Sequence, residues 1–267
     1  MDFLYQIKLS FSFYLRAVRF VDQKKIWNLL IIPAIVNLII AILIVIFALK
    51  TSAIVIEYIV LNFTSTDQDQ SVSKFVEGML LIVVRAIVFF LYLKVYRYTL
   101  LIFLAPSFAF ISSKIQMMDS GISNTLCTRD YLAFCSRGMK IAIRNFLIEV
   151  FASTVIIIIS ILMTWVIPII PLVILVIEGY FMGFSMADYR NEYHKMTIKE
   201  STSKIHGYLG LILGNGVLFN IFLIVPVVGV LFAPAIALIA SGLSINYVEK
   251  RKHILCNSNQ STLIMAK

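Results

Sequence analysis

The sequence predicts an all-α integral membrane protein, and three observations support this class. Hydrophobic residues make up 60% of the 267-residue chain, charged residues make up only 14%, and the mean hydropathy is +0.94. A soluble domain of this length cannot bury so much apolar surface, whereas a bilayer can. Several apolar runs reach or approach the roughly 20 residues of one helical crossing. These runs do not alternate polar and apolar positions, as the strands of a membrane β-barrel would.

The charged and reactive residues argue against other functional classes. The net charge is +9, but Lys and Arg follow the apolar segments and form no stripe with interleaved aromatic residues, so we expect no nucleic-acid partner. The sequence has no paired metal-binding histidines, no Gly-rich phosphate loop and no nucleophile–base set. We therefore expect no enzyme activity, no metal and no cofactor. Three scattered cysteines, Cys127, Cys135 and Cys256, predict reduced thiols.

The first half of the chain predicts one interfacial helix and two long membrane helices. Within residues 1–25, Lys8, Arg16 and Arg19 fall roughly on one helical face against many aromatic residues, which is typical of a helix lying on the membrane. Residues 27–49 and 78–111 follow as long transmembrane helices, because each contains an apolar run of crossing length.

The second half predicts two Pro-broken helical hairpins, over residues 146–187 and 209–248. Proline lacks the N–H that an α-helix needs and clashes with the preceding turn, so each run should reverse at its prolines. Some arms are shorter than the hydrocarbon core, which indicates re-entrant half-helices. Ordinary hairpins of short, tilted spans remain the alternative. The turning points are expected at Pro168 and Pro171 in the first run and at Pro226 and Pro234 in the second.

Lys and Arg distribution predicts the topology. Residues 50–77 carry two basic residues and four acidic ones, whereas basic residues outnumber acidic ones in the other polar stretches, 1–28, 112–145, 188–208 and 249–267. By the positive-inside rule these four stretches are cytoplasmic. We therefore expect both termini in the cytoplasm, with 249–267 as a cytoplasmic tail, and a single membrane domain over residues 1–267.

Four ordered segments resemble the CysZ/etoposide-induced-protein (EI24 domain) family of integral membrane proteins. They read "YLRAVRFVDQKKIWNLLIIPAIVN" from residue 14, "LAPSFAFISSKIQ" from residue 104, "GYFMGFSMADYRNEYHKMTIKES" from residue 179, and "GNG" with the spaced Pro, Gly and Ala residues of 214–241. The resemblance covers almost the whole chain. It implies two long transmembrane helices, two pairs of membrane-penetrating half-helices, homo-oligomers and, for bacterial members, sulfate uptake across the inner (plasma) membrane.

The residues at the first crossing differ from those of the sulfate-transporting branch. That branch carries a Gly-aliphatic-Arg-Arg motif that contacts the anion, and Lys25–Asn28 stand there in this chain. A lysine attracts an anion as a point charge but lacks the bidentate geometry of arginine. The candidate ligand-binding residues for a small inorganic anion such as sulfate are therefore Lys24 and Lys25 at the entrance and Arg85 deeper in, with altered specificity.

Two further features leave alternatives open. Arg85 could instead snorkel to the outer interface or pair with Glu149 or Glu178. Asp188, Glu192 and His194 have a faint metal-ligand pattern, but the neighbouring basic residues favour a solvated loop. The function is therefore either an anion channel or transporter, or a non-transporting membrane scaffold or assembly factor whose cytoplasmic loops bind partners.

The topology yields a direct prediction. In a variant without native cysteines, a single cysteine at position 195 should be protected from a membrane-impermeant thiol reagent added outside, because residues 188–208 are Lys/Arg-rich. A cysteine at position 60 should be labelled. Labelling of position 195 together with protection of position 60 in intact cells would reverse the assigned orientation.

Overall fold

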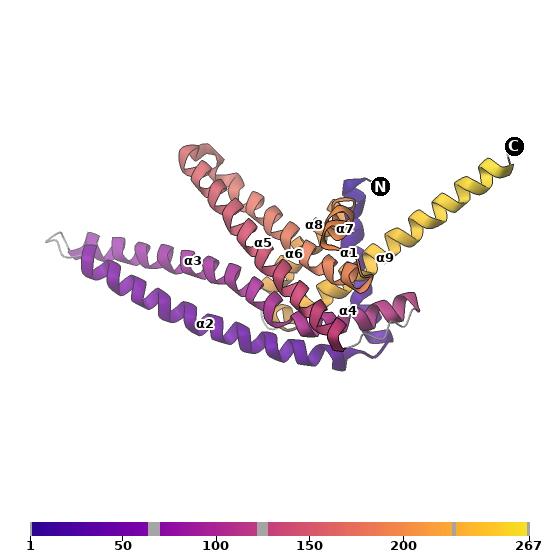
Figure 1. Ribbon diagram of the computed structural model, residues 1–267. Helices are drawn as coiled ribbons and strands as arrows, with labels where there is room; N and C mark the ends of the chain where they lie inside the picture. Colours follow the sequence, from indigo (N-terminus) through magenta and orange to yellow (C-terminus); the bar gives the residue numbers. More distant parts are fainter. Residues whose placement is uncertain (1, 64–69, 122–127, 226–227, 266–267) are drawn as a thin grey trace. The chain divides into compact units, whose positions relative to one another are not determined.

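The computed structural model describes residues 2–63, 70–121, 128–225 and 228–265, and this part of the chain is helical with no strand (Figure 1). Among the described residues, five helices are long and apolar enough to cross a membrane, or six if one bent pair counts as a single span. The predicted class, an all-helical membrane protein, is confirmed. The elements are α1 (Phe3–Gln23), α2 (Trp27–Phe63), α3 (Gln70–Phe103), α4 (Ala105–Ser120), α5 (Thr128–Leu162), the 3₁₀ helix η1 (Thr164–Ile169), α6 (Ile170–Tyr193), α7 (Ile198–His206), α8 (Leu209–Ile224) and α9 (Val228–Met265).

The chain forms two compact units. The first contains the residues up to Ile35 and those from Leu101 onward, and the second contains Val36–Leu100. In the second unit α2 and α3 lie side by side and antiparallel (Figure 1). Tyr96 donates a hydrogen bond to Asn37 Oδ1 at 2.7 Å, and the hydroxyls of Thr51 and Tyr92 are also 2.7 Å apart. These bonds satisfy polar groups that would otherwise face hydrocarbon.

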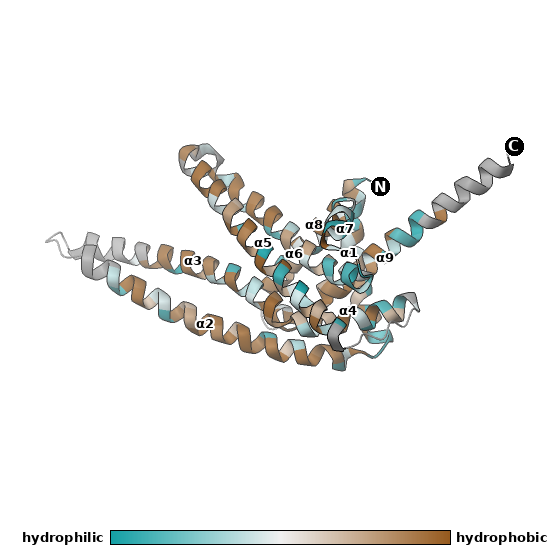
Figure 2. Ribbon diagram, in the orientation of Figure 1, coloured by the Kyte–Doolittle hydropathy of each residue, from teal (hydrophilic) through white to brown (hydrophobic). Residues whose placement is uncertain are grey.

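Large apolar side chains cover the outside of the long helices. Figure 2 shows hydrophobic residues along α2, α5 and α6, and several of them are mostly exposed, such as Ile32 (66%) and Phe151 (72%). Exposing so much contiguous apolar surface to water is unfavourable, whereas contact of this surface with lipid tails is not. The exposure therefore agrees with helices that sit in a bilayer.

The helix boundaries in the first half differ from the predicted ones. α2 continues to Phe63, well beyond the expected end at residue 49, and the predicted helix 78–111 is two helices. α3 ends at Phe103 and α4 begins at Ala105, with Pro106 in its first turn. A proline is tolerated at the start of a helix because the N–H it lacks would have no intrahelical partner there, so Pro106 starts a new helix and does not continue the old one.

The prolines of the second half have three different roles. Pro168 lies in η1, and Pro171 lies in the first turn of α6, so the first reversal falls where the sequence predicted it. α8 ends at Ile224 and α9 begins at Val228; Pro226, expected to mark the second reversal, falls outside the described residues. Pro234 is inside α9, so the expectation that it also marks a turn is wrong. It is the seventh residue of that helix and lies past the first turn, so the helix continues although proline lacks the N–H for an intrahelical hydrogen bond there.

Glycines bring α6 and α8 into direct backbone contact. A methyl group at Gly183 would collide with the carbonyl of Ile212, and one at Gly216 would collide with the carbonyl of Gly179. Gly179 and Gly183 are four residues apart and lie on the same face of α6, the spacing of small residues that allows membrane helices to approach closely. Gly216 of the "GNG" sequence therefore takes part in a close helix–helix contact.

α1 is attached to α8 and α9 by polar contacts as well as by apolar packing. The Gln6 side-chain oxygen accepts hydrogen bonds from the backbone N–H groups of Gly210 (3.1 Å) and Leu211 (3.3 Å), at the start of α8. Tyr14 donates to the carbonyl of Asn215 at 2.7 Å. α8 begins directly after a bend of 93° relative to α7. Gln6 therefore accepts from Gly210 at a helix start, where N–H groups lack intrahelical partners, while the N–H of Leu211 is shared with the carbonyl of Tyr208. One face of the predicted interfacial helix is therefore buried in protein.

The close contact between α6 and α8 predicts that Gly216→Ala destabilises the fold. The added methyl group meets backbone atoms that cannot rotate away, and overpacking of this kind costs about 1–3 kcal/mol. The thermal midpoint of the detergent-solubilised protein measures the effect. Gly78→Ala is the matched control, because a methyl group there meets nothing within 4 Å and alanine favours a helix over glycine. Equal midpoints for the two variants would contradict the packing account.

Candidate functional site

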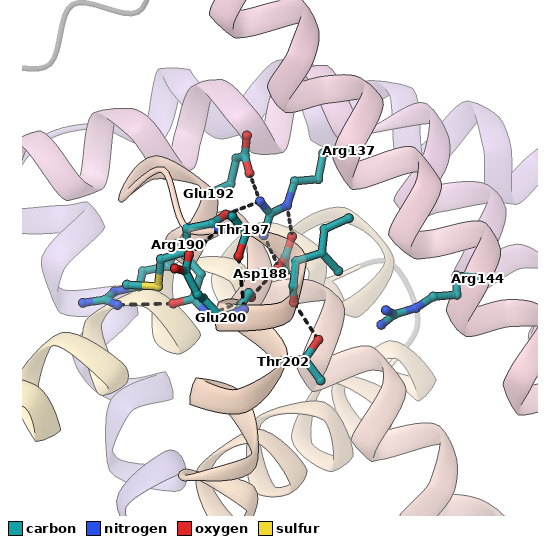
Figure 3. Close-up of polar contacts among 12 residues, drawn as sticks. Arg137, Arg144, Asp188, Arg190, Glu192, Thr197, Glu200 and Thr202 are labelled. Atoms are coloured by element: carbon teal, nitrogen blue, oxygen red, sulfur yellow. Dashed lines mark hydrogen bonds and ion pairs between the residues drawn. The ribbon is translucent and has the colours of Figure 1, made fainter.

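A buried ion pair connects α5 to α6. The Nε of Arg137 lies 3.1 Å from Asp188 Oδ2, and its Nη2 lies 2.8 Å from Oδ1, which is a bidentate arrangement (Figure 3). The remaining nitrogen, Nη1, contacts Glu192 Oε2 and the carbonyl of Met196. Only 4% of the Asp188 side chain is exposed. A buried pair with this geometry compensates much of the cost of removing both charges from water.

A second ion pair connects α6 to α9. Arg190 donates to Glu249 Oε2 at 2.5 Å and to Asn246 Oδ1 at 2.8 Å. Glu249 also accepts a contact from Lys204 of α7 at 2.6 Å. Arg190 and Asp188 are close in sequence but point to different partner helices, so the end of α6 is attached on two sides.

α7 links the two ion pairs. The Ser201 hydroxyl donates to Asp188 Oδ1 at 2.5 Å and accepts from Asn191 Nδ2 at 3.0 Å. Thr197 and Glu200 form a capping box at the start of α7, and the hydrogen bonds from Thr197 lower the pKa of the Glu200 carboxyl. The network thus joins α5, α6, α7 and α9.

The predicted solvated loop at 188–194 is wrong. Asp188 and Arg190 are buried, and the helix continues to Tyr193. Burial, and secondarily the charge of Arg190, lowers the pKa of His194 to about 4, so its ring is neutral at neutral pH. In the described part of the chain, no group of three His, Cys, Asp or Glu residues is arranged to hold a metal ion.

A basic cavity of about 330 Å³ lies between α1, α4 and α9. Three of its lining residues are cations, Arg16, Arg19 and Lys250, and one is an anion, Asp119. Asp119 is already engaged, because Lys250 Nζ lies 3.2 Å and Asn246 Nδ2 2.7 Å from its Oδ2. The cavity therefore offers an excess of positive charge. Its volume is at the lower end of the range for small-molecule sites.

Aromatic rings hold one of the cavity's arginines. The guanidinium carbon of Arg16 lies 4.9 Å from the ring centroid of Phe13 and 5.5 Å from that of Tyr247. Stacking on a ring face uses the plane of a guanidinium and leaves the N–H groups at its edge available. Arg16 can therefore donate in-plane hydrogen bonds to an oxyanion in the cavity.

The predicted site residues lie in two different units. Lys24 and Lys25 are exposed in the turn between α1 and α2, directly after Gln23, which lines the basic cavity. Lys25 has a φ of 51°, which this tight turn imposes on it. Arg85 is exposed on α3, in the second unit. Lys24 and Lys25 are neighbours in the chain, and an anion path that includes them or Arg85 remains a prediction.

The sequence does not identify the cavity residues as a set. Arg16 and Arg19 lie on the polar face predicted for the first helix. The sequence gives no sign that Lys250 and Asp119 lie beside each other in the same cavity, because they are 131 positions apart in the chain. The spacing of Arg16 and Arg19 on one face was the only local signal.

The buried network predicts that Asp188→Asn is strongly destabilising. The substitution leaves Arg137 beside an uncharged amide, with the more exposed carboxylate of Glu192 as its remaining charged partner, and breaking one side of a buried pair costs up to about 3–5 kcal/mol. Lys199→Gln is the control, because Lys199 is exposed on α7, and it should leave the thermal midpoint nearly unchanged. The double variant Arg137→Gln/Asp188→Asn should lose less stability than the sum of the two single variants. Strict additivity would show that the pair is not coupled.

Comparison with known proteins gives one family match. The family model described as EI24: Sulfate transporter CysZ/Etoposide-induced protein 2.4 matches residues 13–234. No curated protein matches the chain. The matched range begins in α1 and ends inside α9, so it contains most of the network and cavity residues described above.

Proposed function

The chain belongs to the sulfate transporter CysZ/etoposide-induced protein 2.4 family, and from this membership we propose that it conducts a small inorganic anion of the sulfate type across a membrane. The family description names a transporter, so we assign no catalytic role to any residue. The anion would be captured in the basic cavity. This cavity is the observation that supports the function most directly, because Arg16 and Arg19 remain in excess after its third cation, Lys250, pairs with its one acid, Asp119.

Capture would proceed in two stages. Lys24 and Lys25 are exposed beside the cavity residue Gln23 and raise the local concentration of anions by their charge. Arg16 and Arg19 then replace water around the anion with charge-assisted hydrogen bonds, which are stronger than neutral ones. We propose that this arrangement takes the place of the Arg-Arg motif that the sequence lacks, and the different position of these arginines in the chain supports altered specificity.

The short length of α8 supports its interpretation as a re-entrant segment. Its 16 residues cover about 24 Å at 1.5 Å per residue, less than the ~30 Å hydrocarbon core. The 35 residues of α5 and the 24 of α6 are long enough to span. We propose that α8 is a half-helix and that α5 and α6 form a full hairpin, within one membrane domain.

Cellular placement and assembly are part of the same proposal. We place the protein in a bacterial inner membrane as a homo-oligomer, with both termini and the segment from residue 249 in the cytoplasm. The Lys/Arg distribution and the family resemblance support this placement. α9 runs through residue 249 without interruption as far as Met265, so the proposed tail is helical over its described part.

Radiolabelled sulfate uptake into proteoliposomes tests the function. Arg16→Gln/Arg19→Gln should raise the concentration of half-maximal flux by about tenfold or more, because each charge-assisted bond contributes roughly 1.5–3 kcal/mol. Lys24→Ala/Lys25→Ala should lower the uptake rate mainly at low salt. Asp119→Asn, in the same cavity, removes the negative charge and should shift the concentration dependence in the opposite direction.

Three outcomes would change the proposal. If vesicles with the wild-type protein take up no more anion than empty vesicles, the scaffold function replaces the transport proposal. Flux that is unaffected in the Arg16/Arg19 variant would remove the cavity from the path while transport stands. Unchanged flux in Arg85→Gln would limit the path to residues of the first unit.

A further inference from the structure

We propose that an anionic phospholipid binds a specific site in the first unit, with an acyl chain in an apolar cavity between α1, α6 and α8 and its phosphate at Arg144 and His206. This site is separate from the basic cavity, since the two share no lining residue. It does not depend on the proposed transport function.

The apolar cavity provides the place for the chain. It has a volume of about 320 Å³, and its walls come from Phe3 of α1, from Val176, Ile177 and Phe181 of α6, and from Leu209 and Leu213 of α8. Its lip is open, because Phe3, Val176 and Leu209 are each two-fifths or more exposed. The α6 wall belongs to a helix segment, Ile167–Tyr193, that is long and apolar enough to span a membrane. An apolar cavity that opens from such a helix faces lipid tails.

A polar group borders this cavity at Tyr180. Tyr180 lines the cavity with its ring, while its hydroxyl lies 3.3 Å from Nε2 of His206. The two rings are stacked, with centroids 6.5 Å apart and planes inclined by 15°. The exposed imidazole of His206 is therefore held at the cavity's edge, with its second ring nitrogen available to a ligand.

Arg144 supplies a positive charge near Tyr180, to which one aromatic ring connects it. Its guanidinium carbon lies 5.1 Å from the ring centroid of Phe184, and that ring is 6.2 Å from the ring of Tyr180. Figure 3 shows Arg144 apart from the network that pairs Arg137 and Arg190 with acids. Its hydrogen bonds go to the neutral side chain of Asn145, and no described carboxylate forms an ion pair with it.

An arginine in this position needs a counter-ion. Arg144 lies within Asp130–Ser160, a segment that also qualifies as a membrane span, and charges in such segments are paired or mark a functional contact. A lipid phosphate is the anion that a membrane presents beside an apolar cavity. A lipid with a net negative headgroup fits better than a zwitterionic one, because it adds no cation next to Arg144. Charge complementarity and the adjoining cavity therefore select an anionic phospholipid.

Native mass spectrometry of the delipidated full-length protein tests the site. Phosphatidylglycerol and phosphatidylcholine are titrated separately, and we expect wild type to retain phosphatidylglycerol about tenfold more tightly. Arg144→Gln should abolish this preference, and Arg144→Lys should keep part of it. Lys140→Gln is the matched control, because it removes an exposed charge one turn away on the same helix. Leu213→Trp should weaken both lipids by filling the cavity.

The outcomes separate the site from general lipid contact. An unchanged phosphatidylglycerol preference in Arg144→Gln would overturn the proposal. Displacement of the lipid by soluble glycerol phosphate would also overturn it, by showing a site for free phosphate. If Leu213→Trp does not fold, Val176→Trp on the exposed lip blocks the same cavity. If a tryptophan variant folds and still binds lipid as the wild type does, the acyl chain lies elsewhere.

Discussion

The bidentate pair between Arg137 and Asp188 is the interaction on which the first unit depends. Asp188 accepts hydrogen bonds from Arg137 of α5 and from Ser201 of α7, and one turn further along α6 Glu192 contacts the same guanidinium. Charges buried among apolar helices are costly unless each has a partner. The end of α6 therefore has few alternative positions, because a shift would leave several charges unpaired at once. The cavity walls contributed by α4 and α9 are connected to this fixed point through Asn246, which contacts both Arg190 and Asp119.

Glycine contacts complement this polar anchor further along α6. The packing of Gly183 against the Ile212 carbonyl and of Gly216 against the Gly179 carbonyl brings the two backbones together and leaves no room for an added atom. In a membrane, apolar side chains face lipid or a neighbouring helix at similar cost, so close backbone packing and hydrogen bonds decide which helices associate. α6 is thus held by charge at one end and by close backbone contact with α8 further along.

Much of the fold could be predicted from the sequence, because hydropathy, proline and charge act locally. The helical class and the reversal at Pro168 and Pro171 are visible in the residues themselves. The role of Pro234 could not be seen in the sequence, because a proline inside a helix and a proline in a turn look alike until the preceding residues are placed. The candidate site was predictable only in part. Lys24 and Lys25 adjoin the cavity, but its walls come from α1, α4 and α9, and pairing across such distances has no local signature. The burial of Asp188 was hidden for the same reason, since its partner is 51 residues away.

The attachment of α1 has a consequence for the order of events during synthesis. Its anchors on α8, Gly210 and Asn215, lie about 200 positions later in the chain than Gln6 and Tyr14. At 5–20 residues per second, a ribosome needs roughly 10–40 s to reach them. During that interval the first helix has none of its α8 contacts, and its apolar side chains must be sheltered elsewhere. The exposed residues Leu4, Phe11 and Leu15, spaced along one side of α1, suit it to wait at the bilayer surface. The same helix can then serve first as a membrane-surface segment and later as a docked component of the finished protein.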